Sequence, residues 1–239
     1  RKPTALSQHT FLIPHRRGTT QVAMPVVLYI APASPPCSFV RSLAKSIGVE
    51  LQLKNLDLSK KEHLTADFLK LNPFHKVPTL DDDGFVVYES VAIAYYLLRK
   101  YAPKSELYPD CIKHRTHIDR ILATLSATII PHKGVFFRSR FLDKTKPSKD
   151  ELAAFEENVL KGIENLIGDG KFAVGDKLTV ADLYLLTNLV GIFETGCFDK
   201  TKFKKLATYY ERIKSELPYF DEVYGLPLSI MNKRWSELQ

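Results

Sequence analysis

The chain of 239 residues is 45% hydrophobic and 26% charged, a composition that suits one large domain or two small ones with a sizeable core. Its net charge of +7 suggests nucleic acid, but residues 1–49 hold six basic side chains and no acidic one, which leaves the rest nearly balanced. Because nucleic-acid binding needs a concentrated basic face, we do not expect it. No apolar run approaches the roughly 20 residues that cross a bilayer, so we expect no membrane partner.

The three cysteines are Cys37, Cys111 and Cys197. Their odd number and wide spacing do not fit a disulfide framework. The spacing also differs from the usual zinc-binding patterns, so we expect no metal. Free thiols favour a reducing compartment, and we therefore expect a cytoplasmic protein.

Residues 1–25 differ in composition from the rest of the chain, because they contain Ser, Thr, Arg and His but no acidic side chain. Two interpretations remain open for this segment. One is a disordered or appended extension before a natural start at Met24, and the other is an organelle presequence, which has a similar composition. We favour the extension, because no long amphipathic helix is visible. A secretory signal is not expected, since no apolar segment follows the charges.

Residues 26–101 alternate between strand-like and helix-like patterns in the order β-α-β-α-β-β-α. A helix joins the first two strands, which predicts that they are parallel. An Asp-Gly turn joins the last two strands, which predicts an antiparallel hairpin. The expected elements lie at residues 26–31, 34–48, 49–53, around Phe68 and Leu69, at 77–80, 85–88 and 91–98.

Residues 102–111 contain Pro103 and Pro109 without periodicity, and they predict a linker. Helical spacing dominates residues 112–239, which predicts an all-helical second domain. Residues 180–193 are apolar almost all round, as expected of a central buried helix. Apolar residues at helical spacing mark the other helices: Ile118 to Leu125, Phe155 to Leu166 after a capping box at Ser148–Glu151, and Leu206 to Leu217.

Four short motifs occupy set places in the first domain. They are Ser34-Pro35-Pro36-Cys37, His63-Leu64, the stretch from Phe68 to Asp82 (FLKLNPFHKVPTLDD), and Glu89-Ser90 shortly before Ala92-Ile93. Together they resemble the delta and epsilon classes of arthropod cytosolic glutathione transferases over roughly residues 26–225. The resemblance implies a glutathione transferase fold, in which a thioredoxin-like βαβαββα domain is followed by a C-terminal helical bundle, an α/β plus all-α architecture.

The resemblance also implies a role for individual residues. Ser34 is the expected thiol-activating hydroxyl. His63 and His75 are expected at the glycine end of glutathione, Glu89 and Ser90 at the γ-glutamyl end. The backbone of Val77, before a cis-Pro78, is expected to pair with the cysteinyl part.

Two positions depart from the pattern of these classes. Val91 follows the Glu-Ser pair, where Arg or His is usual, and a contact to the peptide is then missing. Ser38 follows Cys37, where Arg is usual, and a change in local packing is the expected effect.

The chemistry supports Ser34 independently, because it lies where a strand gives way to a helix. Free N–H groups and the helix dipole favour negative charge there. A thiol has an unperturbed pKa of about 8.5, so a hydroxyl that donates to the sulfur helps to ionise it. The alternative is that Ser34 only caps the helix. Cys37 has no cysteine partner three residues earlier, so a dithiol mechanism is excluded and a buried helix residue is expected.

The other candidates also have structural interpretations. Ser90 opens a helix whose N-terminus suits a carboxylate, with Glu89 beside it for an ammonium, but both are also ordinary capping residues. Pro78 is cis by resemblance, whereas a trans proline at an edge strand is the alternative. His63 and His75 can donate to a carboxylate, although a loop histidine is usually just solvated.

A pocket for the second substrate is expected from aromatic residues late in the first long helix of the second domain. Its candidate members are Pro36, Leu58, Phe136, Phe137 and Phe141. The alternative is that these aromatics belong to the core.

The leading hypothesis is therefore a glutathione transferase that conjugates the thiolate of its co-substrate glutathione to apolar electrophiles, in detoxification, with glutathione peroxidase activity as a possible second reaction. A non-catalytic carrier of glutathione or apolar ligands on the same fold is the alternative, and a protein-interaction module is a third. The resemblance implies a homodimer.

Overall fold

A computed structural model describes residues 25–239, so nearly all of the segment 1–25 lies outside the described residues. The first part is built on a four-stranded sheet of order β2-β1-β3-β4. Its strands are β1 (Val26–Ile30), β2 (Leu51–Asn55), β3 (Thr79–Asp82) and β4 (Phe85–Tyr88). β1 runs parallel to β2 and antiparallel to β3, which pairs antiparallel with β4. The predicted βαβαββα fold is confirmed.

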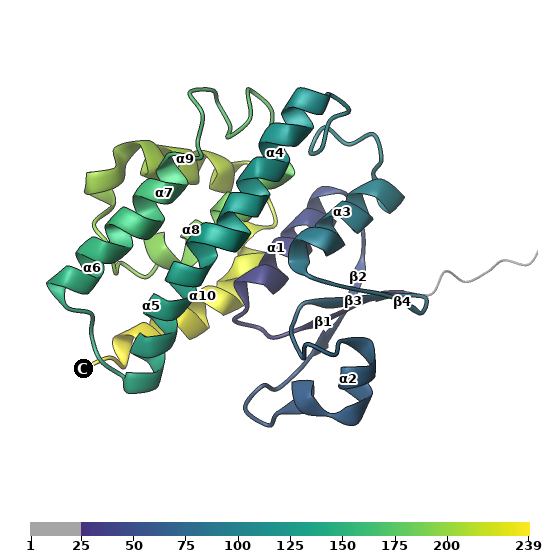
Figure 1. Ribbon diagram of the computed structural model, residues 1–239, viewed down its shortest axis with the longest axis horizontal. Coiled ribbons are helices and arrows are strands. Elements are labelled where there is room, and N and C mark those ends of the chain that lie inside the picture. The colour runs from purple at the N-terminus through teal and green to yellow at the C-terminus, as the bar shows by residue number, and fades with distance from the viewer. Residues whose placement is uncertain (1–24) are drawn as a thin grey trace, which may run out of the picture.

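Helices cover both faces of this sheet. They are α1 (Pro35–Ser46), the short η1 (Glu62–Leu64), α2 (Ala66–Leu71) and α3 (Ser90–Tyr101). Figure 1 shows α1 and α3 on the face that adjoins the helical part, with α2 on the opposite face. This arrangement brings the N-termini of α1 and α3 toward the junction with the second part of the molecule.

The β3–β4 hairpin follows the predicted Asp-Gly signal. Asp83 and Gly84 have φ angles of 54° and 85°, the left-handed pair that a two-residue hairpin turn requires. Gly84 N–H donates to the Asp81 carboxylate at 2.9 Å. The turn is therefore fixed by local sequence alone.

The second part is entirely helical. Its helical elements are α4 (Ile112–Thr124), η2 (Leu125–Ile129), α5 (Ile130–Asp143), α6 (Lys149–Phe155), η3 (Glu156–Leu160), α7 (Lys161–Glu164), α8 (Val180–Phe193), η4 (Lys200–Phe203), α9 (Lys204–Ser215) and α10 (Phe220–Ser236). α4, η2 and α5 follow one another without a break, and η2 is a π-helical turn just before Pro131. Pro131 has no backbone N–H to complete the regular helical hydrogen-bond pattern, and a π turn is one of the ways in which a helix accommodates such an irregularity.

Helix α8 lies at the centre, as its apolar sequence predicts, and all its residues except Gly191 are buried. It packs against α1 of the sheet part, where the rings of Phe39 and Tyr184 are 4.5 Å apart. The contact joins the two parts through a common core. Among residues 25–239, no helix is long and apolar enough to cross a membrane.

Helix α10 extends beyond the last helix that the periodicity marked, and it contains Pro227. Proline has no N–H, so the carbonyl of Val223, four residues earlier, loses its helical partner. Arg41 of α1 fills the gap, because its two terminal nitrogens donate to the carbonyls of Val223 and Glu222 at 3.3 and 3.0 Å. A residue 182 positions earlier in the chain thus completes the helix.

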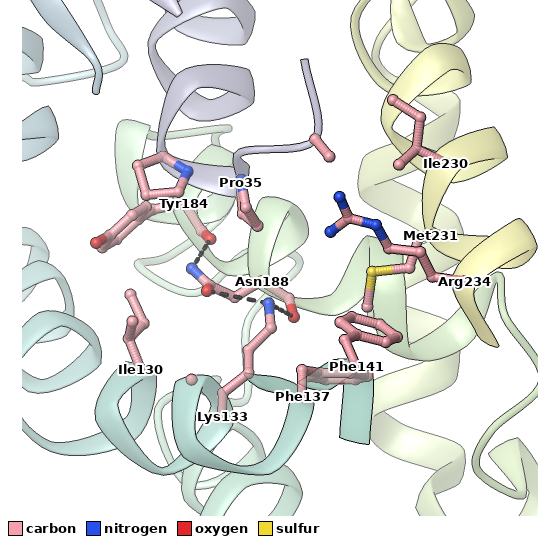
Figure 2. A pocket seen from close by; sticks show the side chains of 13 residues that line it. Pro35, Ile130, Lys133, Phe137, Phe141, Tyr184, Asn188, Ile230, Met231 and Arg234 are labelled. Atoms are coloured by element: carbon pink, nitrogen blue, oxygen red, sulfur yellow. Dashed lines mark hydrogen bonds between the residues drawn. The ribbon is translucent and has the colours of Figure 1, made fainter. Parts of the chain in front are cut away.

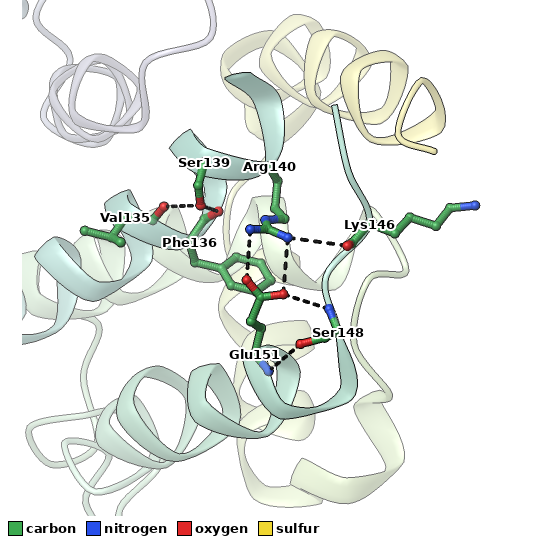
Figure 3. A network of polar contacts seen from close by, with 7 residues as sticks. All are labelled: Val135, Phe136, Ser139, Arg140, Lys146, Ser148 and Glu151. Carbon is green, nitrogen blue, oxygen red and sulfur yellow. Dashed lines mark hydrogen bonds and ion pairs between the residues drawn. The ribbon is translucent and has the colours of Figure 1, made fainter. Parts of the chain in front are cut away.

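The turn between α5 and α6 is held by a polar network (Figure 3). Ser148 and Glu151 form the predicted capping box, with Ser148 N–H donating to the Glu151 carboxylate at 2.8 Å. Arg140 of α5 binds both oxygens of that carboxylate, at 2.8 and 3.2 Å. The C-terminus joins the same turn, because Lys146 N–H donates to the carbonyl of Gln239 at 2.8 Å.

Candidate functional site

Two adjoining cavities lie where the sheet part meets the helical part. The larger, which we call the polar cavity, has a volume of about 660 Å³ and is lined mainly by α3, α4 and residues 76–78 of the loop before β3. The smaller, which we call the apolar cavity, has a volume of about 250 Å³ and lies between α1, α5, α8 and α10. Both are lined by Pro36, Ile130 and Tyr184, so they meet at the start of α1.

The polar cavity carries balanced charge. Its cationic lining residues are Lys76 and Arg99, and its anionic ones are Glu89 and Asp119. The Asp119 carboxylate accepts hydrogen bonds from Tyr95 Oη at 2.5 Å and Tyr108 Oη at 2.9 Å. A cavity of this kind suits a polar ligand that bears both signs of charge.

Ser34 is the N-cap residue of α1, half-buried, and its side chain makes no capping hydrogen bond. Ala33, Pro35 and Pro36, which flank it in sequence, line the apolar cavity. Burial raises the pKa of the Cys37 thiol to about 11, while the Ser34 hydroxyl beside it acts in the opposite direction. The Ser34 hydroxyl therefore lies beside the Cys37 sulfur, and the pKa of that thiol stays above its ordinary value in spite of this neighbour. Cys37 itself is 2% exposed.

The Val77–Pro78 peptide bond is cis. Val77 and Pro78 both line the polar cavity, and none of the backbone hydrogen bonds formed within residues 25–239 uses the N–H or C=O of Val77. The loop is held from behind, because the buried Asn72 amide donates to the Lys76 carbonyl and to Thr79 Oγ1, each at 3.0 Å. The loop before β3 therefore presents the free backbone groups of Val77 to the cavity.

Glu89 and Ser90 lie at the N-terminus of α3 and also line the polar cavity. Glu89 has a φ of 67°, a conformation that is uncommon for a residue other than glycine and that concentrates at functional sites. Burial raises the pKa of Tyr184, and the hydroxyls of Ser126 and Ser90 act against it. Ser90 is thus next to the tyrosine that both cavities share.

His63 and His75 come together in space, with ring centroids 6.4 Å apart. Neither contributes to the lining of the polar cavity, although Lys76 beside His75 does. His75 has a φ of 47° and is exposed. The Nδ1 atom of His63 is buried and has no hydrogen-bond partner within the described part of the chain.

Of the five residues expected in a second pocket, Pro36, Phe137 and Phe141 line the apolar cavity. Figure 2 shows the two phenylalanines on its wall. Phe136 faces elsewhere, since it lies in a groove beside Phe155, at a ring distance of 4.4 Å. Leu58 is 44% exposed and lines neither cavity. Neighbouring helix residues point about 100° apart, so Phe136 and Phe137 cannot share one face.

Other lining residues were not singled out from the sequence, because they come from helices far apart in the chain. They are Ile130, Lys133, Tyr184, Asn188, Ile230, Met231 and Arg234. Tyr184 and Asn188 belong to the apolar α8. They lie four residues apart and therefore on one face of the helix, and two polar residues placed in this way in an apolar helix are the sequence signal that could have indicated a site. Among the described residues, no group of three or more His, Cys, Asp or Glu side chains is placed to hold a metal ion.

Comparison with known proteins gives two family matches. Residues 24–99 match the model of the glutathione S-transferase N-terminal domain, and residues 117–216 match that of the C-terminal domain. Among solved structures, a delta-class glutathione transferase from Nilaparvata lugens is 31% identical, with a TM-score of 0.82 over 90% of this chain and 100% of that one.

Two further neighbours come from other insects. The Bombyx mori glutathione transferase BmGSTD1 is 28% identical, with a TM-score of 0.81 over 90% of this chain and 98% of that one. An epsilon-class glutathione S-transferase from the housefly, Musca domestica, is 27% identical, with a TM-score of 0.79 over 89% of this chain and 98% of that one. The resemblance found from the motifs is therefore confirmed.

Proposed function

The chain belongs to the glutathione S-transferase family, and on that premise we propose that it joins the sulfur of glutathione to apolar electrophiles, with Ser34 stabilising the thiolate. The observation that carries the proposal is the junction of a charged cavity and an apolar cavity at the start of α1, beside Ser34. Glutathione in one cavity and an electrophile in the other are thereby held close enough to react.

The charges of the polar cavity support glutathione as its occupant. The tripeptide carries two carboxylates, one ammonium and a thiol. Ser90 and the free N–H groups at the start of α3 suit the γ-glutamyl carboxylate, while Glu89 suits the ammonium. The free backbone of Val77, before Pro78, suits the cysteinyl part. His63 and His75 are proposed to bind the glycine end of glutathione, which would extend past Lys76 and out of the polar cavity.

Val91 occupies the place where the related classes usually have Arg or His, and it lines the polar cavity. The next cation on the same face of α3 is Arg99, eight residues later and therefore roughly 12 Å along the helix. Arg99 is too far to replace a contact made at position 91. Glutathione is thus held at this end by Ser90 and the backbone rather than by a cation.

The energy required of Ser34 is modest. Lowering the pKa of a thiol by about two units takes roughly 2.7 kcal/mol of preference for the anion. A hydrogen bond to a charged group supplies about 1.5–3 kcal/mol, and a helix N-terminus adds about 0.3–1 kcal/mol. Pro35 and Pro36 leave the first turn of α1 without two N–H donors, so the hydroxyl carries more of the effect than it does at an ordinary helix start.

The Ser34→Ala variant tests this role. We expect kcat/KM with glutathione and 1-chloro-2,4-dinitrobenzene to fall roughly 10- to 100-fold, because one charge-assisted hydrogen bond is lost. The pKa of enzyme-bound glutathione, followed by thiolate absorbance, should rise by one to two units. Ser46→Ala, on the same helix but away from both cavities, serves as the control. A Ser34→Ala enzyme with the wild-type rate and thiol pKa contradicts the role of Ser34.

The same assay separates the transferase from a carrier. Wild-type protein that binds glutathione and apolar ligands but turns over no electrophile supports a non-catalytic carrier. We further propose that the conjugation serves detoxification in the cytoplasm, that organic hydroperoxides are a second class of substrate, and that the enzyme works as a homodimer. These proposals follow from family membership, and the cavity chemistry agrees with the substrate classes.

A further inference from the structure

The apolar cavity contains a buried amine. Lys133 of α5 is 7% exposed, and its Nζ donates to the main-chain carbonyl of Asn188 at 2.7 Å and to Asn188 Oδ1 at 3.3 Å. Figure 2 shows the side chain reaching from α5 toward Asn188, among the residues that line the cavity. When Lys133 is protonated, two of its three hydrogens are thus used, and the third is available to an occupant.

No negative charge balances this amine in the described part of the chain. None of the cavity's lining residues is acidic, and Lys133 takes part in none of the ion pairs formed by residues 25–239. The nearby Cys197 does not serve as a counter-ion, because burial raises the pKa of its thiol to about 11. Burial also lowers the pKa of Lys133 to about 7.

A buried and unbalanced cation is costly, and it becomes favourable when negative charge develops beside it. The rest of the cavity wall is mostly apolar, including Phe137, Phe141 and Met231. The other cation, Arg234, lies 5.8 Å over the Phe141 ring on the α10 side. The site therefore suits an apolar molecule with one oxygen acceptor that lies against Lys133 Nζ. This oxygen should gain negative charge as the reaction proceeds.

We propose that Lys133 determines substrate specificity by binding the carbonyl oxygen of conjugated enals and enones and stabilising the enolate formed when glutathione adds to them. This proposal rests on the proposed transferase function and names its preferred substrate class. Conjugated carbonyl compounds fit the site because the oxygen is a neutral acceptor in the substrate and becomes anionic only during the reaction.

The reaction balances without any further reagent. The thiolate sulfur forms a bond to the β-carbon, and the π electrons of the C=C bond move through the α-carbon onto the carbonyl oxygen. Lys133 Nζ donates a hydrogen bond to that oxygen through its free hydrogen and keeps its proton throughout. The α-carbon then takes up one proton from water, which balances the proton that the thiol lost on ionisation. The product is the saturated thioether, with no change in net oxidation state.

A permanently anionic ligand, such as a fatty carboxylate, is the competing occupant. Its charge is the same before and after binding, so Lys133 would hold it tightly without accelerating any reaction. The enolate is favoured because an interaction that strengthens only in the transition state raises kcat. The two occupants therefore predict different effects on kcat and on inhibition.

The test compares two electrophiles in the wild type, Lys133→Met and Arg234→Met. The enone trans-4-phenyl-3-buten-2-one develops an oxyanion, whereas benzyl chloride has no oxygen. In Lys133→Met, kcat/KM for the enone should fall about 100-fold, mostly through kcat. The value for benzyl chloride should change less than threefold, which also shows that the variant is folded. Arg234→Met should change both rates by similar factors.

The outcomes distinguish a failure of the proposed transferase function from a failure of the role of Lys133. A wild type that turns over neither electrophile overturns the proposed transferase function and this inference with it. A wild type active on benzyl chloride, with both rates falling together in Lys133→Met or the enone rate unchanged, overturns only the role of Lys133. Strong inhibition of the wild type by decanoate that is lost in Lys133→Met, without a selective loss of the enone rate, assigns the site to anions instead.

Discussion

Lys133 is a charged side chain that the fold buries although most lysines remain in water. Its amine is surrounded by groups from several elements. Asn188 and Tyr184 face the cavity from α8, Arg234 faces it from α10, and Cys197 follows α8. None of these groups supplies a negative charge, since burial raises the pKa values of both Tyr184 and Cys197. Burial of the Lys133 amine therefore destabilises the fold, and its proposed role in binding substrate explains why the residue is there.

Because burial lowers the pKa of Lys133, we expect the free energy of unfolding to depend on pH. The pKa of Lys133 is about 7 in the folded protein and about 10.4 in an unfolded chain. Between these values the unfolded state binds more protons, so raising the pH stabilises the fold. Lys133→Met removes this penalty and should raise the free energy of unfolding by about 2–4 kcal/mol at pH 6, allowing for the lost hydrogen bonds to Asn188.

The gain should shrink as the pH approaches 10, where the unfolded lysine also loses its proton. Urea unfolding of wild type and Lys133→Met across pH 6–10 measures the difference. A gain that is constant with pH contradicts a depressed pKa. A loss of stability at pH 6 means that the bonds to Asn188 outweigh the desolvation of the charge.

Two capping boxes show how burial changes the value of the same motif at the level of a helix. At the start of α8, Asp182 is fully buried and its carboxylate accepts from Thr179 N–H and Oγ1, Ala173 N–H and Tyr209 Oη, at 2.6–2.8 Å. At the start of α6, Glu151 is exposed and bonds Ser148 N–H and Arg140. The first box ties α8 to α9 and to the preceding loop, whereas the second holds only a surface turn.

Removing the two acidic residues should therefore have unequal effects. Asp182→Ala leaves several buried donors without acceptors and should cost about 3–5 kcal/mol of unfolding free energy. Glu151→Ala, the matched control, leaves donors that water can reach and should cost about 1 kcal/mol or less. Chemical denaturation of both variants checks the difference. Equal losses would mean that the buried network around α8 adds nothing beyond an ordinary cap.

The exposed aromatic side chains of the sheet part bear on the assembly of the whole molecule. Phe74 and Phe85 are 60% and 57% exposed, although large apolar side chains are usually covered. Phe74 lies edge-on to Tyr88, with ring centroids 5.7 Å apart, and Phe85 lies against Tyr96 at 5.2 Å. These contacts place both phenylalanines on the surface near β4, where a second chain can cover them.

We expect the protein to be a homodimer in solution, in agreement with its family. Light scattering coupled to size exclusion should give twice the mass of one chain at micromolar concentration. Phe74→Glu should shift the protein toward the monomer, because a charge cannot be buried there without a partner. Leu142→Glu, at an exposed apolar residue on α5 (70% exposed), serves as the control. A wild type that remains monomeric contradicts the prediction.

The fold class and most of its elements can be predicted from the amino-acid sequence. Local signals were sufficient for the hairpin at Asp83-Gly84, the capping boxes and the buried α8, because each depends on neighbours within a few residues. The motifs from Ser34 to Ser90 lie in one short domain, and they also identified the family correctly. The roles of the individual residues in these motifs remain predictions that the proposed variants test.

Contacts between segments that lie far apart in the chain cannot be predicted in this way, because they depend on how the helices pack. Helix α10 continues through Pro227 because Arg41 of α1 supplies the hydrogen bonds that the local sequence lacks. Phe136 and Phe137 are equivalent candidates in the sequence, yet the helix turns Phe136 away from the apolar cavity. Lys133 is an ordinary lysine in the sequence, and the packing of α5 against α8 makes it a buried donor. Burial and side-chain direction come from contacts between helices, which local sequence patterns do not record.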